Sequence, residues 1–111
     1  MLQISLQNNV DIIKRLFEQS GLICDPLSLV MAATEQNRVL GHCIFRVAGD
    51  VCEVYAINAG DDTLADGLIR AALNFGLNRG AVTARIAGRD KPVAIGEFLM
   101  CRMCGHCGDI I

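Results

Sequence analysis

The chain has 111 residues, and ten Lys and Arg against twelve Asp and Glu give it a formal net charge of −2. This near balance excludes the strongly charged surfaces that attract nucleic acid or anionic membranes. Hydrophobic residues make up 52% of the sequence, too many for a disordered chain, and no apolar stretch is long enough to span a membrane. The first residues lack the features of a secretory signal. We therefore expect residues 1–111 to form one globular domain in the cytoplasm, without nucleic-acid or membrane partners.

Strands and one helix are expected in the first half of the chain. Alternating apolar and polar residues predict a strand over residues 2–6, and the spacing of apolar residues after Asn9 predicts a helix that ends near Gly21. A strand over residues 27–34 and a polar turn follow. The next two strands, 39–48 and 51–57, flank Gly49-Asp50, a dipeptide typical of a tight hairpin turn.

The hairpin turn also predicts a register. If Ala48 faces Val51 and the pairing continues without interruption, Arg46 lies opposite Glu53. The same pairing places His42 opposite Ile57, where a structural histidine is favoured over a catalytic one. One face of the hairpin is then wholly apolar and consists of Cys43, Phe45, Val47, Cys52, Val54 and Ala56.

The second half predicts two helices and one strand. Thr63 and Asp66 fit a capping box at the start of a long helix, in which Asp66 and Arg70 can form an ion pair, and Arg79-Gly80 ends that helix. A strand over residues 82–86 and a helix from about residue 90 to 103 complete the chain. The fold class is therefore α/β (α+β), with a mixed, mostly antiparallel sheet and helices on both faces.

Four segments match features of a known family: residues 41–47, 54–57, 68–73 and 78–81. They look like its G-x-x-x-x-R strand, its splayed central strand, its L-L-x-A-L helix and its R-G helix exit. With the order of elements, the chain resembles the GCN5-related N-acetyltransferase (GNAT) superfamily over residues 27–103. The resemblance implies an acyl-CoA N-acyltransferase-like fold that lacks the family's last strands. It also implies transfer of an acyl group from acetyl-CoA to the amine of a small molecule or peptide, and an exposed strand edge that favours a homodimer.

The family binds the pyrophosphate of acetyl-CoA on backbone N–H groups of a Q/R-x-x-G-x-G/A loop at a helix N-terminus. That loop falls on residues 60–65, where only Ala65 matches, so the acetyl-CoA loop is degenerate. Asp61 and Asp62 place two negative charges there, which either oppose phosphate or simply stabilise the helix N-terminus. The resemblance assigns cofactor binding mainly to backbone groups of Ile57, Asn58, Thr63, Leu64 and Ala65.

Catalytic groups are few. Glu53 is the candidate general base, but a simple cross-strand ion pair with Arg46 is the favoured interpretation. Phe98 stands where many members of the family have a tyrosine general acid, and Phe cannot donate a proton.

Three cysteines near the C-terminus, Cys101, Cys104 and Cys107, have a spacing that suits zinc or an iron–sulfur cluster. Cys104 begins a cysteine-rich tail over residues 104–111. The sequence lacks a second pair of metal ligands, so the favoured interpretation is that Cys101 packs as a small apolar residue and that the tail thiols are exposed without a specific role.

Three functions stay open. The first is an acetyl-CoA-dependent N-acyltransferase. The second is a binding or dimerisation module that keeps the fold without catalysis, and the third is a metal- or redox-responsive protein that uses the C-terminal cysteines.

Overall fold

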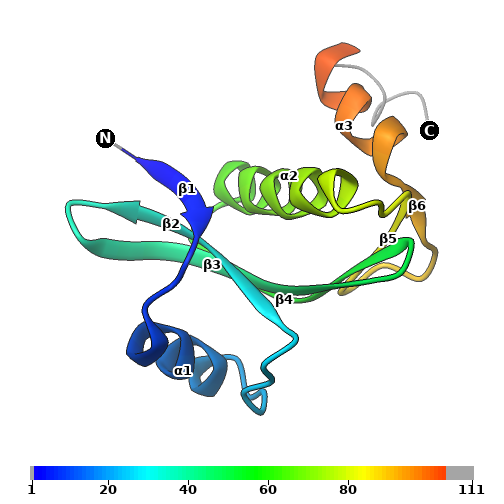
Figure 1. Ribbon diagram of the computed structural model, residues 1–111. Coiled ribbons are helices and arrows are strands. Elements are labelled where there is room, and N and C mark those ends of the chain that lie inside the picture. Colours follow the sequence, from blue (N-terminus) through cyan, green and yellow to red (C-terminus); the bar gives the residue numbers. More distant parts are fainter. Residues whose placement is uncertain (1, 105–111) are drawn as a thin grey trace.

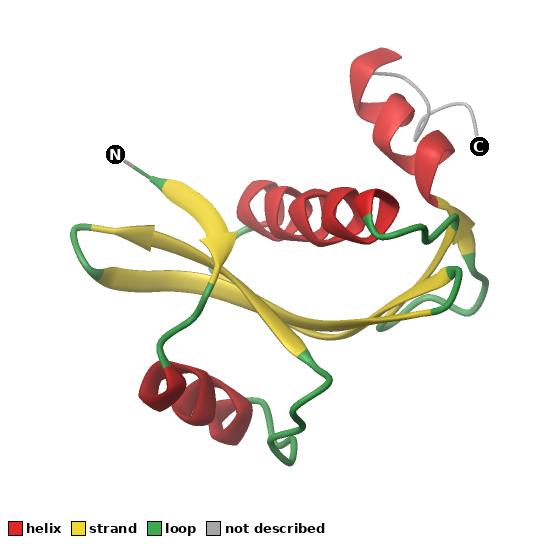
Figure 2. Ribbon diagram, viewed as in Figure 1, coloured by secondary structure: helices red, strands yellow, loops and turns green. Residues whose placement is uncertain are grey.

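The structure is a computed structural model that describes residues 2–104, with side chains for residues 2–100. Six strands form one sheet in sequence order, antiparallel except for the parallel pair β4–β5. Two helices, α2 and α3, lie on one side of this sheet and α1 lies on the other (Figures 1 and 2). The elements are β1 (Gln3–Leu6), α1 (Val10–Gln19), β2 (Leu29–Glu35), β3 (Arg38–Ala48), β4 (Val51–Ala59), α2 (Asp62–Asn78), β5 (Thr83–Ile86), β6 (Val93–Ala94) and α3 (Ile95–Cys104).

Helix α1 begins and ends close to the predicted residues. The side chain of Asn9 accepts hydrogen bonds from the N–H groups of Asp11 and Ile12, which confirms Asn9 as the N-cap. Gly21, with a positive φ of 71°, follows the end of the helix. On the sheet side, Leu16 and Phe17 pack with Val30 and Ile44 in a small apolar cluster.

Two predicted helix starts were wrong. Helix α2 is capped by Asp61, whose side chain accepts from the N–H of Leu64, and not by a box of Thr63 and Asp66. Helix α3 begins at Ile95, later than predicted, because Val93 and Ala94 form the short strand β6. Pairing with β5 supplies these residues with backbone partners before the chain turns into the helix.

The predicted register holds only for the first part of the hairpin. Ala48 faces Val51 and Arg46 faces Glu53, as expected, but the pairing shifts after Phe45 and Val54. Ile44 then pairs with Ala56, so Tyr55 is an extra residue in β4, a β-bulge. Because one extra residue exchanges the two faces of a strand, each residue of β4 after the bulge lies on the face opposite to the predicted one.

Beyond the bulge, Ile57 therefore points toward α2, and Ala56 packs on the α1 side with Ile44. The prediction that Ala56 belongs to the face of Cys43 was wrong. His42 pairs with Asn58 and not with Ile57. The bulge thus decides which side chains of the second half of β4 reach each helix.

The main core lies between the sheet and α2. Its buried side chains include Phe45, Leu68, Leu73 and Ile95, and the rings of Phe45 and Phe75 meet edge to face with centres 5.7 Å apart. Helix α2 ends at Asn78 with Arg79 as its C-cap, and Gly80 follows with a φ of 97°, so the helix ends where the sequence predicts. Among the described helices, none combines the length and apolar character needed to cross a membrane.

Candidate functional site

Strands β4 and β5 separate part-way along their length. Their last pair is Val54 with Ile86, and the N–H of Ala87 donates to the carbonyl of Val54 at 2.9 Å. Strand β4 then continues to Ala59, so residues 55–59 have no strand neighbour on the β5 side within the described part of the chain. The bulge at Tyr55 lies directly at this point of separation. The open edge of β4 leads straight into the N-terminus of α2.

The N-terminus of α2 is partly occupied by the chain's own carboxylate. Asp61 accepts a hydrogen bond of 2.7 Å from the N–H of Leu64, and its carbonyl accepts the first helical bond from Ala65 at 3.1 Å. The N–H groups of Asp62 and Thr63 precede that bond and have no partner within the helix, which is the usual state of a helix N-terminus. Asp62 adds a second exposed carboxylate. A helix N-terminus attracts anions, but here two negative charges already stand at it.

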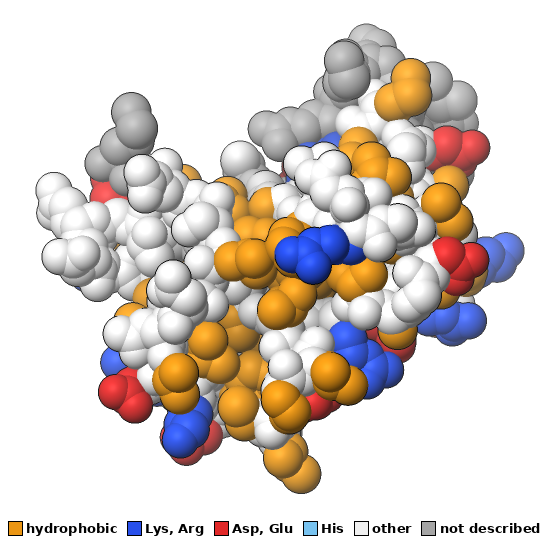
Figure 3. Space-filling view, in the orientation of Figure 1, with side chains coloured by type: hydrophobic (Ala, Val, Ile, Leu, Met, Phe, Trp, Pro, Cys, Tyr) orange, Lys and Arg blue, Asp and Glu red, His pale blue; other side chains and the backbone are white. Residues whose placement is uncertain are grey.

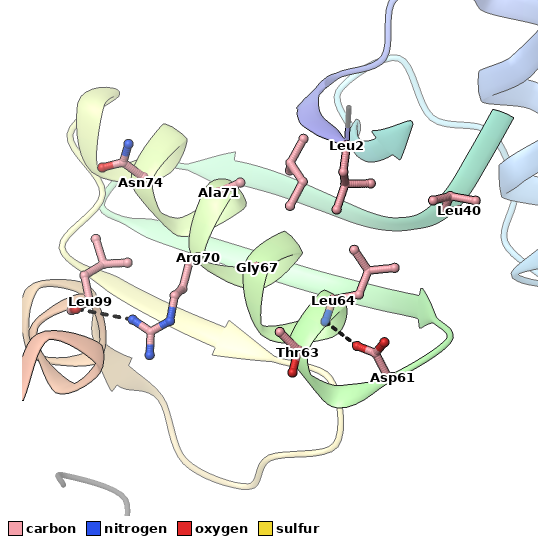
Figure 4. Close-up of a pocket in the computed structure, with 11 residues that line it drawn as sticks. Leu2, Leu40, Asp61, Thr63, Leu64, Gly67, Arg70, Ala71, Asn74 and Leu99 are labelled. Carbon is pink, nitrogen blue, oxygen red and sulfur yellow. Dashed lines mark hydrogen bonds between the residues drawn. The ribbon is translucent and has the colours of Figure 1, made fainter. Parts of the chain in front are cut away.

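A groove of about 800 Å³ runs along the outer side of α2. Figure 4 shows Leu2 and Leu40 on one wall, Leu99 on the other, and Gly67 and Ala71 of α2 between them. Figure 3 shows the surface hollowed here, between β1 and α3. The walls are mostly apolar, and Asp61 and Thr63 stand at the end where α2 begins.

The structure brings together two of the five predicted cofactor-binding residues. Thr63 and Leu64 line the groove. The N–H of Ala65 is used within the helix, Ile57 packs in the core, and Asn58 lines a different pocket, beside His42 and α1. One cavity therefore does not collect all five, and a ligand that contacted Asn58 and Thr63 together would have to pass around the end of β4.

Comparison with solved structures identifies this architecture. An acetyltransferase of the GNAT family from Brucella melitensis, solved with acetyl-CoA, superposes with a TM-score of 0.61 at 18% identity, over 81% of this chain and 77% of its own. An aminoglycoside acetyltransferase from a soil metagenomic sample superposes with a TM-score of 0.64 at 15% identity, over 82% of each chain. The chain has the GNAT fold.

A third similar structure is a ribosomal-protein-alanine N-acetyltransferase from Brucella melitensis biovar Abortus 2308, with a TM-score of 0.61 at 14% identity, over 77% of this chain and 78% of its own. No protein-family model matches the sequence, and no curated protein matches it. At identities this low, the GNAT fold is shared while the chemistry of each site has to be argued from its own residues.

Glu53, the predicted general base of the GNAT site, forms an ion pair. Its carboxylate lies 3.5 Å from the guanidinium of Arg46, and both side chains are about one-third exposed, at 32% and 33%. Glu53 also faces Arg85 across the parallel β4–β5 pair. The guanidinium carbon of Arg46 lies 6.0 Å from the ring centre of Tyr55. Burial, followed by the nearby charge of Glu53, raises the pKa of Tyr55, so its hydroxyl stays protonated at neutral pH.

Phe98, at the position of the general acid in many GNAT enzymes, is enclosed by arginines. Arg70 and Arg89 place their guanidinium carbons 4.9 Å and 5.3 Å from its ring centre. Arg70 also donates to the carbonyl groups of Phe98 and Leu99, at 3.0 Å and 3.2 Å, and pairs with Asp66 at 2.7 Å. The i,i+4 pair of Asp66 and Arg70 is thus confirmed, and Arg70 joins α2 to α3.

Five of the six cysteines divide into two sets, and the sixth, Cys24, is exposed and free. Cys101 and Cys104 belong to α3, but their side chains and all of Cys107 lie outside the described residues. Within the described residues, no three His, Cys, Asp or Glu side chains cluster to hold a metal, and the side chains of the predicted ligands of zinc or an iron–sulfur cluster lie outside that part of the chain. Burial raises the pKa of Cys43 to about 12 and that of Cys52 to about 11, which makes both thiols unreactive at neutral pH.

Sequence reasoning missed three features of this site: the cap at Asp61, the bulge at Tyr55 and the groove along α2. The sequence does contain a signal for the bulge. Glu53 and Asn58 are polar residues five positions apart in one strand, and uninterrupted alternation would place them on opposite faces. They can share one face only if an extra residue lies between them. No local signal reveals the groove, since its walls come from β1 and α3, far apart in the sequence.

Proposed function

We propose that this protein is an acetyl-CoA-dependent N-acyltransferase that transfers an acyl group to an amine of a small molecule or peptide in the cytoplasm. The observation that carries the proposal is the separation of β4 from β5 directly before the N-terminus of α2. The same fold occurs in GNAT structures from Brucella melitensis and Elizabethkingia anophelis that hold acetyl-CoA. The open edge of β4 offers backbone groups near Ile57 and Asn58 to the thioester arm.

Acetyl-CoA would supply the activated acyl group. The residues of this chain would act mainly by position: backbone groups at Ile57 and Asn58 orient the thioester, and the first turn of α2 at Thr63, Leu64 and Ala65 receives the phosphates. An acceptor amine would attack the thioester carbonyl carbon directly, and the C–S bond would break as the amide C–N bond forms, so that coenzyme A leaves as the free thiol. Glu53 is held by Arg46, so we assign proton removal to water or to the substrate and not to Glu53.

The N-terminus of α2 fits the pyrophosphate poorly as it stands. The Leu64 N–H is already bonded to Asp61, and Asp62 repels phosphate from a neighbouring position. This observation favours a second candidate, a binding or dimerisation module that keeps the GNAT fold without acyl transfer. Phe98, which has no proton to donate, favours the same alternative.

Calorimetric titration of acetyl-CoA into the freshly reduced protein at low salt separates the two candidates. Saturable binding at micromolar affinity would support the acyltransferase, and release of free coenzyme A thiol in the presence of a panel of amines would identify the acceptor. Absence of heat up to millimolar acetyl-CoA would overturn the acyltransferase and leave the binding module.

We also propose that the chain forms a homodimer. Strands β1 and β6 are the edges of the described sheet, and β6 covers only Thr83 and Ala84 of β5. Exposed strand edges pair readily with a second chain. Sedimentation velocity at micromolar concentration tests this proposal, and a single monomeric species would contradict it.

A further inference from the structure

A second pocket, separate from the groove along α2, opens on the α1 side of the sheet. It has a volume of about 360 Å³ and lies between the second half of α1 and the ends of β3 and β4. Its polar side chains are Arg15 and Gln19 from α1, His42 from β3 and Asn58 from β4. Asn58 reaches this pocket because the bulge at Tyr55 exchanges the faces of β4, and it pairs with His42 across the strands.

His42 forms the inner wall of the pocket. The side chain is only 2% exposed, and its Nε2 lies 3.0 Å from Oγ of Ser20, at the end of α1. The other ring nitrogen, Nδ1, has no hydrogen bond within the described residues. It is also not among the fully buried atoms that lack a partner, which in the described residues are limited to Nε of Arg46. Nδ1 therefore keeps some exposure, in a residue that lines the pocket.

The charge that lines the pocket is positive. Arg15 is the only charged side chain that lines it, and no ion pair of Arg15 occurs in the part of the chain that the structure describes. Gln19 and Asn58 add amide N–H donors that also lack partners among the described residues. A guanidinium with neighbouring amide donors and no carboxylate is the set that binds carboxylate or phosphate oxygens.

The C-terminus of α1 opposes an anion only weakly. The carbonyl groups of Leu16, Phe17 and Glu18 already accept hydrogen bonds from N–H groups of residues 20–22, so few of them face the pocket unpaired. Burial lowers the pKa of His42, so the ring is neutral at pH 7 and adds a donor or an acceptor at Nδ1 without charge. Arg15 therefore dominates the local charge.

We propose that this pocket binds a small oxyanion, a carboxylate or phosphate group, between Arg15 and the side chains of Gln19, His42 and Asn58. The inference does not depend on acyl transfer. The anion can belong to a free metabolite or to a phosphate of coenzyme A, since Asn58 lies near the end of β4 that leads to α2. Both sources present the same chemistry to the pocket.

NMR titration tests this site directly. Inorganic phosphate, acetate and coenzyme A are added separately, with chloride as the reference at equal ionic strength, while the His42 ring nitrogens and the side-chain amides of Gln19 and Asn58 are observed. We expect saturable shifts of these signals with phosphate or acetate at millimolar concentration. Saturation with coenzyme A at lower concentration identifies the cofactor as the source, and its absence identifies a free metabolite.

Two matched variants separate a specific site from general attraction of anions. Arg15→Gln should weaken binding about tenfold or more, because it removes the charge-assisted hydrogen bonds. Lys14→Gln removes the same charge from the neighbouring position of α1 outside the pocket and should leave affinity unchanged. Shifts that do not saturate, or equal effects of the two variants, would overturn the proposal.

Discussion

The carboxylate of Asp61 accepts a hydrogen bond of 2.7 Å from the backbone N–H of Leu64, at the start of the helix that follows the open edge of β4 (Figure 4). In this fold the first turn of that helix is the expected place for the phosphates of acetyl-CoA. An N-cap carboxylate stabilises the helix and at the same time supplies the negative charge that a phosphate would otherwise bring. Under the proposed function, helix capping and cofactor binding would therefore compete for the same N–H groups.

Removing these charges should strengthen the binding of acetyl-CoA. Asp61→Asn keeps the cap, since Asn caps about as well as Asp. Together with Asp62→Asn it should raise affinity by about three- to tenfold at low salt, because screened repulsion at a surface amounts to roughly 1 kcal/mol. Calorimetric titration measures the change.

Asp50→Asn is the control for this comparison. Asp50 lies in the β3–β4 turn, at the opposite end of β4 and roughly 26 Å away along the strand. The control should leave the affinity unchanged. Equal affinities for the Asp61/Asp62 double variant and the wild type would place the phosphates elsewhere.

Local patterns predicted the three helices, the strands other than β6, and the short-range pairs of this chain. The Gly49-Asp50 turn gave the correct partner for Arg46, and helical spacing gave the pair of Asp66 and Arg70, because both depend on a few adjacent residues. The bulge at Tyr55 depends on how β4 fits between β3 and β5, which alternation does not encode. One undetected residue there was enough to misplace Ala56 and Ile57.

The candidate site could be predicted less well than the fold. The sequence indicated Thr63 and Leu64, which do line the groove, but not that Asp61 already holds the N–H of Leu64. Side-chain rotamers and groove walls result from tertiary packing, so the residues of one cavity come from elements distant in the sequence. Ile57 and Asn58 were both assigned to one ligand through their backbone groups, and their side chains lie on opposite faces of β4.

Arg70 should be important for the attachment of α3. Its side chain is 14% exposed and donates to the carbonyl groups of Phe98 and Leu99. We expect Arg70→Ala to lower the free energy of unfolding by about 2–3 kcal/mol, because it removes two charge-assisted hydrogen bonds that are partly shielded from water. Urea denaturation measures this loss, and amide exchange in α3 should become faster.

Arg79→Ala is the matched control on the same helix. Arg79 is exposed and lies over the ring of Phe75, with 4.8 Å from the guanidinium carbon to the ring centre. A contact of this kind at an exposed position contributes about 0.5–1 kcal/mol. If Arg70→Ala cost no more than Arg79→Ala, Arg70 would not be the link between α2 and α3.

Gly76 allows α2 to approach β4. A Cβ atom there would lie 2.9 Å from Cβ and 3.1 Å from Sγ of Cys52, which is fully buried. Gly76→Ala should therefore destabilise the fold by about 1–2 kcal/mol, since overpacking outweighs the better helix propensity of Ala. Thermal and urea unfolding provide the measurement. Gly96→Ala in α3 meets open space and should be neutral or slightly stabilising, so a loss at Gly96 as large as that at Gly76 would contradict the packing argument.

His42 should make stability depend on pH. In the unfolded chain its pKa is about 6.5, and burial in the folded protein lowers it. Between the two values the unfolded state binds more protons, so the free energy of unfolding rises with pH in that window. The stabilisation is therefore complete above about pH 6.5 and is lost toward lower pH, by at most about 1.4 kcal/mol per pH unit, until the folded protein also binds the proton.

Urea midpoints at pH 7.5 and 5.5 for the wild type and His42→Gln isolate this contribution. Gln places an amide near the position of Nε2, so it can keep the contact with Ser20 while removing the titration. We expect the wild type to lose more stability than the variant on acidification. A bound oxyanion beside Arg15 would raise the pKa of His42 and reduce the difference, so repeating the measurement in phosphate links this titration to the pocket. Equal losses of stability in the wild type and the variant would show that other groups govern the loss of stability at low pH.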